Sequence, residues 1–472
     1  MRPLVAFALV AVCAAPARAQ NGDLKQEIEE LKRAHGALEE KIRRQEAEIE
    51  SLRQKLASAR GPGGDPAEAR ELERSIDELV AASKDALRWK DLSASASKLR
   101  FYGHLRLDAI YDDSRPSNTQ TIGWVLSEDG DAPPGVGAGG KNRSDLTIHP
   151  RLTRLGLDVD GGTISALGNA AVIGKLEIDF YNSGLAGQSE SRSAIRMRHA
   201  WAKLAWGDFS VLAGQTADVI SPLYPVVNPD LVMWGAGNLG DRRPQFRPEF
   251  STPVGEGRLL FQGEIGLTGA DDNQDLDSPG SYGAGYRDGE TSGLPTLQAR
   301  TALRTPILGM KDLEAGLWVH RAWENPDERI AGETRFDSEA YGFDVTIPIH
   351  EDVVWLKGEG FAGTNVDDVR GGIFQGINRA TGDTIDSMGG WIEVSVKPVS
   401  WYTVSAGYST DDPDNDDLAA GGRAANKIWY LGNRFRFSPV EFGIDYLHWT
   451  TEYVGFSDGT DNRVQAYVSY QF

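Results

Sequence analysis

The sequence predicts an all-β membrane barrel of about 16 antiparallel transmembrane strands, preceded by an α-helical coiled-coil segment in the periplasm. Three observations predict this fold. The first residues resemble an export signal, the spacing of apolar residues changes from a helical to a strand period near Phe101, and long and short connections alternate thereafter. The predicted parts are a signal peptide (1–19), a coiled coil (20–60), a Gly/Pro linker with a second short helix (61–99) and the barrel (100–472).

Residues 1–19 have the three parts of a secretory signal peptide. Arg2 supplies positive charge, residues 4–15 are apolar without an acidic residue, and Ala17-Arg18-Ala19 gives a small-x-small cleavage site. A membrane-anchoring helix would need about 20 apolar residues, more than this segment offers. Because Cys13 lies inside the signal, the mature chain would contain no cysteine, which excludes disulfides and thiol catalysis.

From Leu24 to Leu56 the apolar residues recur at steps of four and three, which is typical of a coiled coil. The polar residues His35 and Gln45 interrupt this seam and are interpreted as fixing its register. The Gly/Pro-rich residues 61–66 end the helix, and the helical spacing resumes briefly from Leu72.

Near Phe101 the period changes to two. Leu105 and Leu107 alternate with Arg106 and Asp108, so one face of the segment is apolar and the other is charged. The same alternation recurs around residues 259–268 and in the last segment, 462–472. A soluble sandwich and a membrane barrel would both show it, so the period alone does not distinguish them.

The connections do distinguish them. Short turns are predicted at 207–208, 349–351, 399–400 and 438–439, and long links at 114–147, 271–293, 364–388 and 410–425. Long outer loops and short periplasmic turns are typical of outer-membrane barrels, whereas a sandwich has no reason to separate the two lengths. The predicted strands begin near Phe101, Ile148, Ala170, Ala194, Phe209, Arg243, Arg258, Thr296, Leu313, Glu339, Val353, Trp391, Tyr402, Asn426, Glu441 and Asn462.

Acidic residues gather in the predicted outer loops, at 128–131, 271–277 and 411–417. Solvated loop tips are the simplest interpretation, and Ca²⁺ binding is the alternative, because successive carboxylates offer several oxygens. The weak candidate ligands are Asp411, Asp412, Asp414, Asp416 and Asp417. Without an EF-hand spacing we expect no metal site and no cofactor, and the net charge of −20 disfavours nucleic acid as a partner.

Three short segments carry a resemblance to a known family. They are residues 195–201 (Ile-Arg-Met-Arg-His-Ala-Trp), 212–216 (Leu-Ala-Gly-Gln-Thr) and 241–247 (Asp-Arg-Arg-Pro-Gln-Phe-Arg). They resemble the DcaP-like porins, which are trimeric outer-membrane channels with an N-terminal periplasmic helical extension. The resemblance implies a homotrimer that conducts small anions such as dicarboxylates. The chain departs from the family pattern at residues 217–220, where an aromatic-rich run is usual.

One feature conflicts with a trimer: Ile and Leu at alternating seam positions of the coiled coil favour two strands. Other expected partners are outer-membrane lipid, lipopolysaccharide and, through the coiled coil, the cell wall.

Strand parity assigns a row of arginines to the barrel lumen, since arginine facing lipid costs about 2–4 kcal/mol near the midplane. Their planar guanidiniums suit carboxylates and stay charged. The predicted lumen residues are Arg106, Arg154, Arg192, Arg196, Arg198, Arg243, Gln245, Arg247, Arg300 and Arg304. Most lie on neighbouring strands, so we expect a basic ladder on one side of the pore.

Residues 217–240 are the predicted constriction loop. The segment is too apolar to remain free in water, so we expect it to fold into the barrel. The residues assigned to the constriction are Asp218, Tyr224, Asp230 and Trp234. Acids facing the arginine ladder would give a transverse field that lowers the barrier for anions.

The sequence therefore predicts an outer-membrane diffusion channel for small hydrophilic solutes, with a preference for small carboxylates. Two alternatives stay open for the lumen. Wall acids such as Asp108, Glu177 and Glu264 would leave an unselective general porin if they pair with the arginines, and a cation preference is also conceivable. A third alternative is a structural protein that tethers the outer membrane to the cell wall through the coiled coil.

No catalytic constellation is recognisable, so we do not expect an enzyme. GxSxG, HExxH and phosphate-loop motifs do not occur in their required contexts. Of the histidines, only His104 and His320 are expected on the lumen face.

Overall fold

The computed structural model describes residues 98–472 except 120, 134, 138–142, 181–192, 194, 228–231, 269–291, 308–309, 327–328 and 351–352. It also describes residues 51–52, 54–56, 72 and 75. The chain divides into two units, Met1–Arg100 and Phe101–Phe472.

In the first unit, every described residue up to Ser75 is helical. The predicted signal peptide and most of the predicted coiled coil lie outside the described residues, so both remain predictions. Among the described residues, no helix combines the length and the apolar character needed to cross a membrane.

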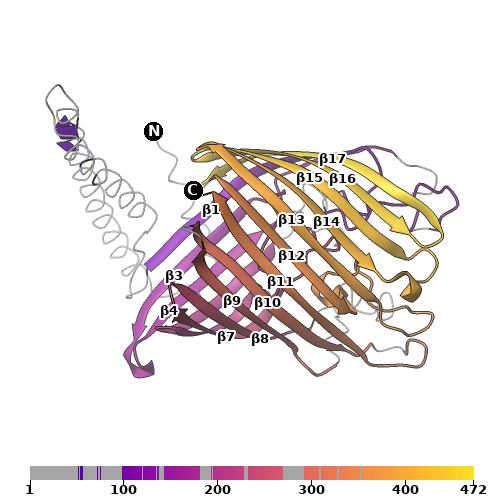
Figure 1. Ribbon diagram of the computed structural model, residues 1–472, viewed down its shortest axis with the longest axis horizontal. Helices are drawn as coiled ribbons and strands as arrows, with labels where there is room; N and C mark the ends of the chain where they lie inside the picture. The colour runs from indigo at the N-terminus through magenta and orange to yellow at the C-terminus, as the bar shows by residue number, and fades with distance from the viewer. Residues whose placement is uncertain are drawn as a thin grey trace, which may run out of the picture. The chain divides into compact units, whose positions relative to one another are not determined.

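The second unit is a closed antiparallel barrel (Figure 1). Its strands are β1 (Lys98–Asp112), β2 (Asp145–His149), β3 (Arg154–Ile164), β4 (Ala170–Asp179), β5 (Arg196–Trp206), β6 (Phe209–Ala217), β7 (Arg242–Val254), β8 (Gly257–Gly266), β9 (Thr296–Ile307), β10 (Met310–Glu324), β11 (Phe336–His350), β12 (Val354–Thr364), β13 (Asp386–Val399), β14 (Tyr402–Pro413), β15 (Arg423–Phe437), β16 (Val440–Tyr453) and β17 (Phe456–Gln471). Short 3₁₀ helices are η1 (Ser165–Leu167), η3 (Val366–Val369) and η4 (Asn415–Asp417).

The barrel closes because β1 pairs with both β17 and β2. β2 and β3 are halves of one transmembrane strand, since both pair with β1 and only a turn from Pro150 to Thr153 separates them. Proline has no backbone N–H for the ladder, which explains a break at this position. The described residues therefore form a barrel of 16 transmembrane strands, as the sequence predicted.

The two faces of each strand differ as the alternation predicted. On β1, Leu105 is 55% exposed on the outer surface, whereas Arg106 and Asp108 are buried on the inner side. On β17, Val464 and Val468 face outward, and Arg463 is fully buried inside. The outer face therefore presents an apolar band, and the charged side chains lie inside the barrel.

Two histidines break the expected parity. At a β-bulge between β4 and β5, Glu177 pairs with His199 and Asp179 with Arg196, so one extra residue enters β5 and moves His199 to the inner face. His149 also faces inward, opposite Asp108. The expectation that only His104 and His320 face the lumen was therefore wrong.

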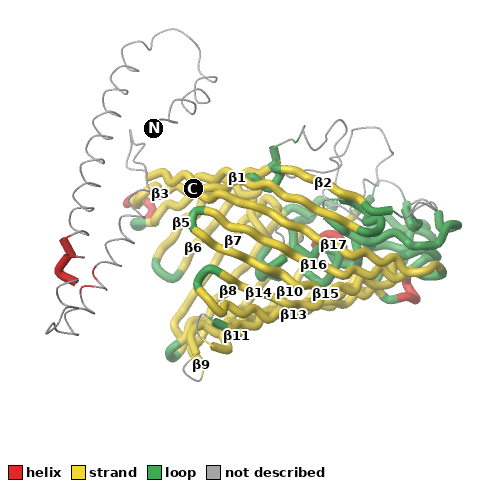
Figure 2. The backbone as a smooth tube through the Cα atoms, turned by 90° about the horizontal axis from the view of Figure 1, so that it is seen from above, coloured by secondary structure: helices red, strands yellow, loops and turns green. Residues whose placement is uncertain are grey.

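Short turns join the strands at one end of the barrel, and most loops at the other end are long (Figure 2). One outer link departs from this pattern: only Val454 and Gly455 join β16 to β17. Gly455 has a positive φ of 80°, which suits a two-residue hairpin turn. The last strand therefore begins at Phe456, earlier than the predicted Asn462.

Three outer loops turn into the barrel and form its apolar core. Ile122 and Val125 of the loop after β1 pack with Met233 of the loop between β6 and β7, against Trp449 of the wall. Leu239 of the same β6–β7 loop packs with buried residues of the β12–β13 loop. Within the described residues, loop 218–241 thus contacts both of the other loops.

Candidate functional site

Loop 218–241 is held against the inner wall by its backbone. The N–H of Val219 donates to Glu264 Oε2 at 3.0 Å, and the N–H of Leu223 donates to Glu359 Oε1 at 2.8 Å. The N–H of Val226 donates to Glu393 Oε2 at 2.5 Å. Carboxylates from three separate strands therefore fix the path of the loop across the barrel interior.

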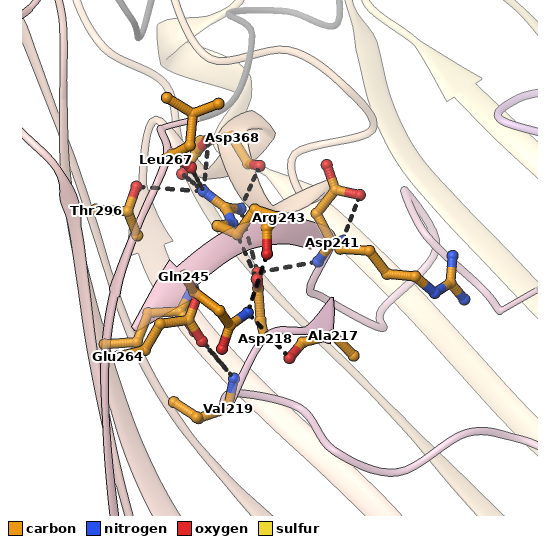
Figure 3. Close-up of polar contacts among 12 residues, drawn as sticks. Ala217, Asp218, Val219, Asp241, Arg243, Gln245, Glu264, Leu267, Thr296 and Asp368 are labelled. Carbon is orange, nitrogen blue, oxygen red and sulfur yellow. Dashed lines mark hydrogen bonds and ion pairs between the residues drawn. The ribbon is translucent and has the colours of Figure 1, made fainter. Parts of the chain in front are cut away.

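Arg243, the second residue of β7, joins the two ends of this loop (Figure 3). Its Nε donates to Asp218 Oδ1 at 2.9 Å, and Asp218 Oδ2 accepts the backbone N–H of Asp241 at 3.0 Å. Burial raises the pKa of Asp218, and the positive charge of Arg243 opposes that rise. The side chain of Arg243 is 0% exposed. It is therefore enclosed by partners and does not face water.

Gln245 and Arg247, which follow on β7, bind the last two residues of β6, directly before the loop. Gln245 Nε2 donates to the carbonyl of Thr216 at 3.1 Å, and Arg247 donates to the carbonyl of Ala217. Arg247 also lies 3.6 Å from Glu264. These predicted lumen residues face inward and bind the backbone at the end of β6, where the loop begins.

A second group of arginines shares a small number of acids. Arg198 Nε donates to Glu177 Oε1 at 2.7 Å, and both Arg196 and Arg198 donate to Asp179. Arg154 lies 3.4 Å from the same Glu177 oxygen. Among the described residues, three guanidiniums therefore face two carboxylates. Their side chains remain 11–29% exposed, so they are accessible to solvent.

Loop 218–241 brings further residues to this group. Arg198 and Arg242 are close enough to Tyr224 to act electrostatically on its phenol. The guanidinium of Arg242 lies 5.7 Å from the ring centre of Trp234, and that of Arg370 lies 5.8 Å from it. The inner surface beside Trp234 is therefore basic and aromatic.

The other predicted lumen arginines have partners of their own. Arg106 pairs with Asp108 at 2.7 Å and covers the ring of Tyr467. Arg300 of β9 pairs at 2.6 Å with Asp344 of β11. It crosses β10 at Gly316, where a Cβ atom would lie 2.5 Å from Asp344 Oδ2.

Arg304 pairs with Glu314 at 2.6 Å near the short-turn end and is 63% exposed. The expected ladder is thus divided into separately paired groups, because wall acids occupy neighbouring positions in the sheet.

Some predicted residues contribute nothing further. Arg192 and Asp230 lie outside the described residues. The five aspartates considered for Ca²⁺ do not converge: Asp411 binds Ser387 inside the barrel, Asp412 is on the opposite face of β14, and Asp414 caps η4. Asp417 accepts the backbone N–H of Asp386. The carboxylates of Asp411, Asp414 and Asp417 thus serve the local fold.

The β12–β13 loop is an inner element that was not predicted from the sequence. Its Asp368 binds Arg243, and its Arg370 binds Asp241 at 2.9 Å. A signal was available, because Val366, Val369 and Ile373 recur as apolar residues within an otherwise polar loop, and all three are buried. The wall acids Glu359 and Glu393 were also missed, since their loop partners are distant in sequence.

Comparisons with known proteins agree with this architecture. The family model described as DcaP outer membrane protein matches residues 24–244. The structure is similar to the crystal structure of the outer membrane channel DcaP of Acinetobacter baumannii, with a TM-score of 0.61 and 18% identity over 80% of this chain and 99% of that chain. No curated protein matches the sequence.

The barrel is also similar to OmpF of Salmonella typhi in complex with daunomycin, with a TM-score of 0.51 and 13% identity over 81% of this chain and 99% of that chain. The resemblance inferred from residues 195–247 is confirmed, because the family model that matches is described as an outer membrane protein.

Proposed function

From its similarity to the DcaP outer membrane proteins over residues 24–244, we propose that this chain is an outer-membrane diffusion channel for small hydrophilic solutes. We propose further that it favours small anions, carboxylates in particular. In this proposal, loop 218–241 narrows the lumen, and the arginines of β3 and β5 attract the solute beside it.

The observation that carries the anion preference is the sharing of Glu177 and Asp179 by Arg154, Arg196 and Arg198. In this proposal the cluster keeps a positive charge despite the pairing, and Arg242 adds to it from the end of the loop. The guanidiniums are planar donors that pair with carboxylates in a two-point geometry. A small carboxylate would therefore gain contacts here that a cation of similar size would not.

The alternative to an anion preference retains the channel function and changes only its selectivity. If the paired acids offset the arginines, the protein is a general porin without selectivity. A homotrimer, a cleaved signal peptide and a periplasmic coiled coil are further parts of the proposal, supported by the family resemblance and by residues 1–60. A tether to the cell wall through the coiled coil would be an additional role, tested by deleting residues 20–99.

The test is the reversal potential of the purified full-length protein in a planar bilayer under a KCl gradient. An anion-signed potential supports the proposal, and replacing Arg196 and Arg198 by Gln should move it toward zero. The matched control is Arg321→Gln, because Arg321 pairs with Asp337 on the outer side of β10 and should leave the potential unchanged. A potential near zero for the unmodified protein indicates a general porin, and the absence of conductance steps contradicts a channel.

A further inference from the structure

We propose that the constriction consists of two interlocked loops, 218–241 and 365–385, and that Arg243 is the positioning residue that locks them together. This inference rests on the proposed channel function and assigns Arg243 a role other than contact with the solute.

The two loops are joined first through their backbones. The N–H of Gly235 donates to the carbonyl of Arg370 at 2.6 Å, and the N–H of Gly240 donates to the carbonyl of Val369 at 2.8 Å. Both bonds connect the second half of loop 218–241 to the end of η3. The two segments therefore run together inside the barrel, although about 130 residues separate them in the chain.

Apolar packing closes the same contact. Leu239 packs in one buried cluster with Val366 and Val369, between the loops and the wall residue Phe361. Gly235 allows a close approach of Phe374: a Cβ atom there would lie 2.4 Å from Phe374 Cε2, and its φ of 68° favours glycine. Any movement of one loop would therefore expose apolar surface of the other.

Arg243 supplies the polar lock at the centre of this contact (Figure 3). Nη1 lies 3.1 Å from Asp368 Oδ2, and Nη2 donates to the Asp368 carbonyl at 3.1 Å. Nε and Nη2 donate to Asp218 on loop 218–241, and Nη1 also donates to the Leu267 carbonyl and to Thr296 Oγ1. One guanidinium thus binds the stem of one loop, the η3 helix of the other and the wall.

Arg370 strengthens the joint from the opposite side. It donates to Asp241 Oδ2 at 2.9 Å, and Asp241 precedes β7 directly. The pairs Arg243–Asp368 and Arg370–Asp241 cross between the loops in opposite directions. Two crossed ion pairs hold both the separation and the register of the segments.

This geometry separates two possible roles of Arg243. A selectivity residue must present its charge to the lumen, but the Arg243 side chain is 0% exposed and its acids are equally enclosed. A lock depends on the fork of the guanidinium, which binds two acids at fixed angles. Lysine at this position would keep the positive charge but could not bind two acids through a planar group.

The experiment compares Arg243→Lys with Asp368→Asn in planar bilayers, using the full-length protein. The lock predicts that both variants raise the single-channel conductance and admit larger neutral sugars in liposome swelling, because either change releases the loops. If Arg243 instead acts through its charge, Arg243→Lys leaves the conductance unchanged, and Asp368→Asn makes the channel more anion-selective at unchanged size. That result would overturn the proposal.

Controls for folding and for charge come from an ion pair on the outside of the barrel. Arg321→Lys and Asp337→Asn make the same chemical changes at a pair that lies 2.6 Å apart and contacts neither loop, so conductance should stay unchanged. If a lock variant fails to fold, Arg370→Gln breaks the second crossed pair and should give the same rise in conductance. An unchanged conductance in Arg370→Gln and in the folded lock variants also contradicts the inference, while the reversal potential tests the channel function separately.

Discussion

The arginines at the start of β5 and the arginine at the start of β7 show two uses of the same side chain in one barrel. Arg196 and Arg198 share carboxylates and remain partly exposed, whereas Arg243 is fully enclosed by two loops and the wall. Both groups face inward by strand parity. Strand parity therefore decides on which side of the barrel wall a charged side chain lies. The ion-pair partners of that side chain decide whether a solute can contact it.

The largest expected effect is a difference in protein stability between variants of Arg243 and variants of the β5 arginines. Replacing Arg243 with Met leaves Asp218 and Asp368 buried without their cation, which costs about 3–5 kcal/mol. Arg196→Met removes a partly exposed ion-pair partner of Asp179 and should lower the free energy of unfolding by at most about 1 kcal/mol. Chemical unfolding of the two purified variants in detergent measures the difference, and equal losses would remove the distinction between the groups.

A smaller effect is expected at the wall that supports loop 218–241. Glu359 accepts N–H groups from Leu223 and from the indole of Trp391, and Gln can accept only through one oxygen. Glu359→Gln should therefore cost about 1–3 kcal/mol, because a buried donor loses its acceptor. Limited proteolysis of loop 218–241 should become faster, and an unchanged cleavage rate would argue against this anchor.

The acids that share the β3 and β5 arginines should limit the attraction of anions. Glu177→Gln removes one negative charge from the cluster, and a charge about 4 Å away is worth about 1 kcal/mol in water. We expect a more anion-signed reversal potential than in the unmodified protein. Glu452→Gln, at an exposed pair with Lys427, is the control. A shift toward cations in Glu177→Gln would mean that Glu177 positions the arginines rather than screening them.

The smallest expected effect is the dependence of selectivity on salt. The Debye length falls from about 10 Å at 0.1 M to about 3 Å at 1 M, so partly exposed charges are screened. The anion preference should weaken over this range, whereas the conductance change in Arg243→Lys should persist, because buried pairs are screened much less. Parallel measurements at both salt concentrations test this contrast.

Much of the barrel could be predicted from the sequence, because the alternation of apolar and polar residues identifies each strand and turn residues mark where the strands end. The exceptions have local physical causes. The bulge at β5 adds one residue without disturbing the local pattern, and it reversed the face assigned to His199. The Val454-Gly455 turn is short, so the start of the last strand was placed too late.

The site was harder to predict, since it depends on contacts between distant segments. Parity placed Arg300 inside, but its partner Asp344 is two strands away and is reached across Gly316. The lock between Arg243 and Asp368 joins positions far apart in the chain, and no spacing in the sequence reveals it. Loop 365–385 was different: its apolar residues were visible and could have indicated an inner position.

The most direct test of the central claim is the reversal potential under a KCl gradient for the unmodified channel and for the variant with Arg154, Arg196 and Arg198 all replaced by Gln. We predict an anion-signed potential that falls to near zero in this variant, with the single-channel conductance still present. A potential that is near zero or cation-signed from the start, or one that survives the triple replacement, would contradict the assignment of selectivity to this cluster.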